Sequence, residues 1–142
     1  MDFEQVENKI LERLRAEVPH LMTLETYAGQ LGEDIGRLPV RFPAAYVIYG
    51  GSRFEPIDGP GHEEEAKFSV LVAARAPRGG GGPGQGGAYG LVKDVLSALS
   101  NSNLGLDMER LRPLRVALVH TSPSVTVYGV DFRASFDGAY GW

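Results

Sequence analysis

The stretch that decides the fold runs from Phe68 to Leu99. It begins with Phe68-Ser-Val-Leu-Val-Ala-Ala-Arg75, continues through a glycine run at residues 79–87, and ends with Ala88–Leu99. The first segment is apolar and rich in β-branched residues, which predicts a strand. In the last segment apolar residues recur at helical spacing, at Ala88, Leu91, Val92, Val95, Leu96 and Leu99.

A second amphipathic helix is predicted before this stretch, from Asp2 to about Pro19. Its apolar stripe consists of Phe3, Val6, Ile10, Leu14 and Val18. Asp2 followed by Gln5 resembles a capping box, and Pro19 ends the helix because the residue before a proline is pushed out of the α region.

Four further strands are predicted. Residues 44–49 are apolar enough to lie buried on both faces and are therefore expected to lie centrally in the sheet. Residues 21–27 alternate weakly, residues 114–120 are apolar with one charge, and residues 125–136 alternate clearly. The polar residues 55–65 are expected to form the long tip of a hairpin. The order α-β-β-β-α-β-β predicts an α+β fold, a mostly antiparallel or mixed sheet of about five strands carrying two main helices.

Length and composition favour one domain at residues 1–136 with an aromatic tail at residues 137–142. The chain has 142 residues and no cysteine, which excludes thiol catalysis and cysteine-ligated metals. The N-terminus lacks the pattern of a signal peptide, and no apolar window is long enough to span a membrane, so we expect a cytoplasmic location. The net charge of −4 argues against a nucleic-acid surface.

The glycine run formally matches a dinucleotide fingerprint at Gly82, Gly84 and Gly87. Eight of the twelve residues 79–90 are glycine, so such a match carries little information. No Gly-Lys-Ser/Thr follows, which excludes a P-loop. A mobile loop is the better interpretation, and a small-ligand or nucleotide-binding enzyme that uses residues 79–87 remains the alternative.

No catalytic, cofactor-binding or metal-binding constellation is predicted. His20, His62 and His120 lie on three separate segments, without the spacing of a helical zinc pair. Arg110, Arg112 and Arg115 form the basic cluster, and the apolar residues between them favour the rim of a protein interface or the edge of the sheet.

Several segments together resemble the small tail-terminator proteins of Mu-like phages and prophages. The residues that carry the resemblance are the opening helix, Glu25-Thr-Tyr27, Leu38-Pro39 with Pro43-Ala-Ala-Tyr-Val47, the spaced Phe68, Val70, Val72 and Arg75, Gly87-Ala-Tyr-Gly-Leu91, and Val127-Tyr-Gly-Val-Asp-Phe132. They cover most of the chain.

This resemblance implies a non-enzymatic protein that caps the tail tube, stops its polymerisation and prepares it for head joining. It implies a homo-oligomeric ring, typically hexameric in such proteins, with tail-tube and head-completion proteins as partners. It also implies assembly in the host cytoplasm and the virion tail as the final location. A head–tail connector or another minor tail protein is the alternative within this class. Loops at residues 55–65 and 77–88 are expected to reach neighbouring molecules. The candidate interface residues are Arg53, Phe54, Arg75, Arg78, Gly80, Gly84, Tyr89, Arg112, Arg115, Tyr140 and Trp142.

Overall fold

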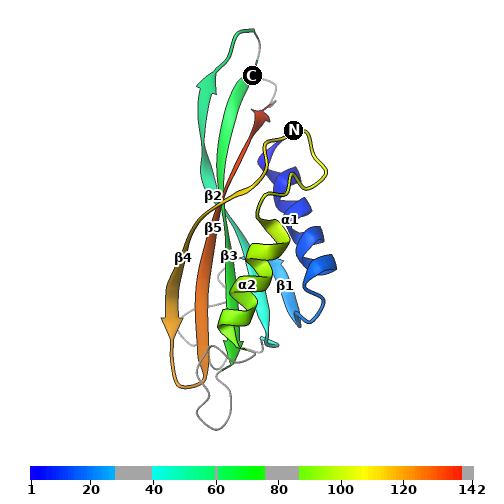
Figure 1. Cartoon of the computed structure of the whole chain (residues 1–142). Helices are drawn as coiled ribbons and strands as arrows, with labels where there is room; N and C mark the ends of the chain where they lie inside the picture. Colours follow the sequence, from blue (N-terminus) through cyan, green and yellow to red (C-terminus); the bar gives the residue numbers. More distant parts are fainter. Residues whose placement is uncertain (28–39, 60, 76–86, 139–142) are drawn as a thin grey trace.

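A five-stranded mixed sheet with helices packed on one face forms the fold. The structure is a computed structural model, and it describes residues 1–27, 40–59, 61–75 and 87–138. The predicted α+β class and the predicted element order are confirmed (Figure 1). The elements are α1 (Phe3–Glu17), β1 (Thr23–Thr26), β2 (Ala44–Pro56), β3 (His62–Arg75), α2 (Ala88–Leu99), β4 (Arg112–Thr121) and β5 (Val125–Gly138).

The strand order in the sheet is β1-β2-β3-β5-β4. The short strand β1 runs parallel to β2, and the other three ladders are antiparallel. Strand β3 lies at the centre of the sheet, between β2 and β5. The strand expected to lie centrally, residues 44–49, is part of β2 and lies next to it, between β1 and β3. The predicted strand at residues 114–120 becomes β4, at the edge of the sheet.

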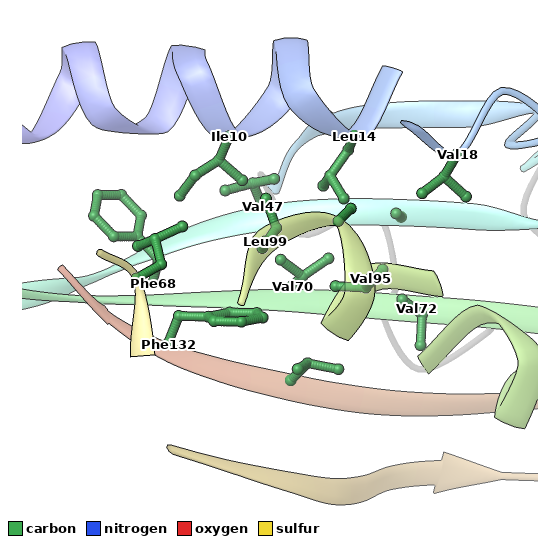
Figure 2. Packing of buried hydrophobic residues seen from close by; sticks show 14 of the residues in the cluster. Ile10, Leu14, Val18, Val47, Phe68, Val70, Val72, Val95, Leu99 and Phe132 are labelled. Atoms are coloured by element: carbon green, nitrogen blue, oxygen red, sulfur yellow. The ribbon is translucent and has the colours of Figure 1, made fainter. Parts of the chain in front are cut away.

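The core lies between the sheet and the two helices. Ile10 and Leu14 of α1 and Val95 and Leu99 of α2 point toward β3, where Val70 is fully buried (Figure 2). The α2 stripe agrees closely with the predicted stripe, except that Leu96 is only partly buried and Ala98 is buried instead. Along β3 and β5, successive side chains point to opposite faces of the sheet. The face that meets the helices is called the covered face here, and the opposite one is called the open face.

The helix termini follow from local hydrogen bonding. The backbone N–H of Gln5 donates to Oδ1 of Asp2 over 2.9 Å, so the predicted N-cap is confirmed. The α1 helix ends at Glu17, and its C-cap residue Val18 leads directly into Pro19. No helix among the described residues is long and apolar enough to cross a membrane.

The hairpin between β2 and β3 corrects a sequence expectation. Residues 55–65 were expected to form a long loop, but β2 continues to Pro56 and β3 begins at His62. The three consecutive glutamates at residues 63–65 concealed the strand pattern. The middle one, Glu64, is fully buried and accepts a hydrogen bond from the hydroxyl of Ser52, while its two neighbours point to the other face.

The hairpin therefore forms an acidic arm, defined here as residues 52–59 and 61–66. It extends beyond the end of α1 (Figure 1). The end of β5 joins it, because β3 pairs His62 with Gly138. Strand β5 thus runs two residues farther than the predicted strand 125–136, and residues 139–142 lie outside the described residues.

A smaller apolar cluster covers part of the open face. Tyr46 is 1% exposed and packs with Ala73, Val125 and Val127, beside the partly buried Phe42. The cluster lies at the end of the sheet near β1.

Candidate subunit interface

Strand β4 exposes an unusual number of apolar side chains. Leu114, Val116, Leu118 and Val119 are between 42% and 57% exposed, although they lie in a regular strand. Together with Arg112 and Arg115 they are called the edge surface here. Contiguous exposed apolar residues on a soluble domain mark protein interfaces more often than isolated ones do.

The exposure follows from where the helices lie. Helix α1 packs over β1 and β2, and α2 packs over β3 and β5, so β4 extends beyond the cover of the helices (Figure 1). Val116 pairs with Val130, and Leu118 pairs with Tyr128, both on the covered face. These two side chains consequently have the orientation of core residues but lie outside the core.

Two β-bulges turn further apolar side chains to the open face. The register of the β4–β5 ladder shifts between Pro113 and Arg115 and again between Leu118 and His120. A Cβ atom built at Gly129 would lie 3.4 Å from Cγ2 of Val119, which places Val119 on the open face. Bulges and prolines commonly blunt an edge strand against indiscriminate pairing. Here they leave a straight stretch of four residues between them.

A buried carboxylate anchors β4 to the rest of the sheet. Asp131 of β5 is 7% exposed, and its Oδ2 accepts a hydrogen bond from Nε of Arg115 over 3.0 Å. The hydroxyl of Ser69 donates to Oδ1 over 2.6 Å, and Nζ of Lys67 lies 3.6 Å from Oδ2. Three adjacent strands thus meet at one side chain.

The pKa of Asp131 reflects the balance of these contacts. Burial raises the pKa, but the hydrogen bond from Ser69 and the charges of Lys67 and Arg115 lower it by more. The net pKa lies below the ordinary value of 3.8. Asp131 is therefore ionised at neutral pH, and its charge holds the guanidinium of Arg115 in place at the edge surface.

Tyr89 of α2 borders the edge surface on the covered face. It is 46% exposed, and its ring lies edge-on to that of Tyr128, with 5.9 Å between the centroids. A hydrogen bond with the Tyr89 hydroxyl, and then burial, raise the pKa of Tyr128. Since Tyr128 pairs with Leu118, the two tyrosines extend the apolar strip of β4 toward α2.

The acidic arm carries the opposite charge. The arm contains one arginine, Arg53, and five acidic residues. Of the acidic residues, Glu55, Asp58 and Glu63 are exposed. Glu63 of the arm and Asp137 of β5 line a hollow together with Asp107. By contrast, residues 110–121 contain three arginines and a histidine and no acidic residue.

The predicted interface residues fall into separate places. Arg53 and Phe54 lie exposed on the acidic arm, while Tyr89, Arg112 and Arg115 lie at or beside the edge surface. Arg75 lies at the far end of β3, where its guanidinium carbon is 4.9 Å from the centroid of the Phe42 ring. The remaining predicted residues, Arg78, Gly80, Gly84, Tyr140 and Trp142, lie outside the described residues, as does most of the predicted loop at residues 77–88.

The exposed apolar residues of β4 were not among the predicted interface residues. The arginine cluster favoured an interface rim or the sheet edge, but an almost continuous apolar strand usually indicates burial on both faces. Strand β4 lies at the edge because it pairs with β5 alone. Among the described residues, no group of three or more histidines and carboxylates is placed to hold a metal ion.

Comparisons with known proteins identify a matching family and a structure with the same fold. The family model described as "Bacteriophage Mu, Gp37" matches residues 3–137. Among solved structures, a chain in "Virion of native gene transfer agent (GTA) particle" superposes with a TM-score of 0.61 at 18% identity, covering 94% of this chain and 95% of that one. None of the curated proteins matches the sequence significantly. At 18% identity the structural match shows a shared fold, whereas the family match spans nearly the whole sequence, and the chain therefore belongs to the Bacteriophage Mu Gp37 family.

Proposed function

We propose that this chain is a non-enzymatic tail-assembly protein of a phage or prophage and acts as a tail terminator. In this role it caps the end of the tail tube, stops polymerisation of the tube and prepares it for joining to the head. The observation that carries the proposal is the match to a phage Mu family over residues 3–137.

The structural neighbour supports a role in a particle. It is part of the virion of a gene transfer agent, and it shares the fold over almost the full length of both chains. A component of a virion works by contact with other proteins, and the exposed apolar side chains of the edge surface suit contact better than catalysis.

A terminator that caps a tube needs several copies around the tube axis. We propose a ring of six identical subunits that meets tail-tube proteins on one side and head-completion proteins on the other. Rings arise from heterologous contacts that close on themselves, in which two different surfaces of the same chain meet. The edge surface lies on β4 at one edge of the sheet, and the acidic arm is the β2–β3 hairpin at one end of the sheet, so the chain offers two different surfaces.

Deletion of the gene from its phage or prophage genome tests the role. A terminator predicts tails of abnormal and variable length in electron micrographs, with normal lengths restored by the wild-type gene in trans. Tails of uniform wild-type length that lack heads would assign the protein to head–tail connection instead. Complete particles with normal tails would contradict a role in tail assembly.

A further inference from the structure

We infer that the edge surface of one copy binds the acidic arm of a second copy, in a head-to-tail contact. The inference rests on the proposed ring and names the surfaces that form it. It is carried by apolar exposure, charge and strand direction, which are independent properties of β4 and of the arm.

The apolar side chains define where the contact is strongest. Leu118 and Val119 are the most exposed of the four apolar residues, at 54% and 57%. Burying an apolar area stabilises a contact by roughly 25 cal/mol for each Å² removed from water. The arm offers apolar partners of its own, because Phe54 is 44% and Ile57 is 37% exposed.

Charge complementarity selects the arm as the occupant. Arg112 is exposed on the edge surface, and the side chain of Arg115 is 70% exposed even though its Nε binds Asp131. The arm presents Glu55 and Glu63 on strands that extend beyond the helices. Complementary charge of this kind fixes which surfaces meet and suppresses other pairings.

Strand direction suits a rotational assembly. Strand β4 is antiparallel to β5, β5 to β3, and β3 to β2, so β4 and β2 of one chain run in opposite directions. In copies that keep the same orientation around an axis, β4 of one copy therefore runs antiparallel to β2 of the next. The β1–β2 ladder ends at the pair Thr26 and Val47, and β2 continues beyond β1 into the arm.

A two-fold contact between two β4 strands is the competing geometry. It would bring two edge surfaces together, each with arginines and no carboxylate in residues 112–121. Such an isologous contact buries both edges at once and stops at a dimer. The head-to-tail contact leaves one edge surface and one arm open at the ends of any chain of copies until the ring closes.

Cysteine cross-linking tests the contact cleanly because the chain has no cysteine of its own. Three single variants are needed, Leu118→Cys on the edge surface, Glu55→Cys on the arm and Lys93→Cys on the exposed side of α2 as a matched control. Each is purified, treated with a short bis-maleimide and analysed by denaturing gel electrophoresis, alone and in equimolar pairs. Static light scattering at the same concentrations reports the oligomer size.

The inference predicts a covalent dimer from the mixture of Leu118→Cys and Glu55→Cys, and at least about tenfold less from either variant alone or from mixtures with Lys93→Cys. The double variant Leu118→Cys/Glu55→Cys should give a ladder of covalent oligomers. A strong dimer band from Leu118→Cys alone would establish the two-fold contact and overturn the inference.

The remaining outcomes separate the inference from the proposed function. A ring in light scattering without the mixed cross-link would overturn these surfaces and leave the ring. A monomer without cross-links at every concentration would overturn the inference as well. The tail-terminator role is decided independently, by the tails of the deletion mutant.

Discussion

Asp131 shows most directly how one residue links stability to the candidate interface. It is buried in the sheet, and its two oxygens accept hydrogen bonds from β3 and β4. The sequence predicted its orientation from the alternation of β5. The three-strand network could not be predicted, because it depends on which strands become neighbours of β5.

Replacement of Asp131 by asparagine should lower the free energy of unfolding at pH 7 by about 1 to 3 kcal/mol, because charge-assisted hydrogen bonds to a buried group are lost. Urea denaturation followed by circular dichroism measures the change. The exposed Asp107, replaced in the same way, is the control and should change stability by less than about 0.5 kcal/mol. Equal losses in the two variants would contradict the assigned network.

The same residue predicts an acid dependence. Since the pKa of Asp131 is lower in the folded chain than its ordinary value of 3.8, its contribution is complete above that value and is lost as the pH falls through the folded-state pKa. The stability difference between wild type and Asp131→Asn should therefore shrink as the pH falls below about 4. A constant difference down to pH 2 would be inconsistent with the lowered pKa.

Two glycines in strands make a matched pair. Gly51 has a φ of +110° at the bulge in β2, which side-chain-bearing residues rarely adopt, so Gly51→Ala should cost about 1 to 3 kcal/mol. At Gly129 a new Cβ meets only side chains, at 3.4 and 3.6 Å, and Gly129→Ala should lie within about 1 kcal/mol of wild type. Urea denaturation compares them, and a larger loss at Gly129 would contradict this account.

At the scale of elements, the sequence predicted the helices and the element types well. The helical periodicity of α1 and α2 and the alternation of β5 depend only on residues that are close in sequence. Such patterns can be recognised without knowing which elements pack together. The acidic arm was missed because Glu64 is a buried carboxylate within a run of glutamates, and its burial depends on Ser52 in the facing strand. The arginine cluster indicated an interface rim or the sheet edge, but the exposure of the apolar side chains of β4 was not predicted, because apolar composition does not distinguish a central strand from an edge strand.

The position of β4 predicts different roles for two leucines. Leu118→Lys should change the free energy of unfolding by less than about 0.5 kcal/mol, because Leu118 is 54% exposed. Leu99→Ala should cost about 2 to 5 kcal/mol, because Leu99 is fully buried under the sheet. Only Leu118→Lys should weaken self-association in light scattering without loss of folded structure. Unfolding of Leu118→Lys would contradict its placement outside the core.

At the scale of the whole molecule, membership of a Mu-like phage family was predictable from the order of the segments and is confirmed by the family match. A single domain at residues 1–136 stays a prediction. The ring and its partners remain proposals, because they concern contacts with other molecules, which the fold of one chain does not determine.

The opposite charges of the edge surface and the acidic arm predict that self-association weakens with salt. Screening shortens the reach of exposed charges from about 10 Å at 0.1 M to about 3 Å at 1 M ionic strength. The apparent dissociation constant from light scattering should rise severalfold between 0.05 and 0.5 M sodium chloride. Arg112→Glu should weaken association at low salt and reduce this salt effect, whereas Lys93→Glu on α2 should change neither. Association that tightens with salt would argue against the charged contact.

The length distribution of tails in the deletion mutant tests the central claim most directly. Tails measured by electron microscopy from induced cells that lack the gene should be abnormal and variable in length. The wild-type gene in trans should restore one sharp length, and the Leu118→Lys gene should fail to do so. A deletion mutant whose tails have the uniform wild-type length would contradict the account.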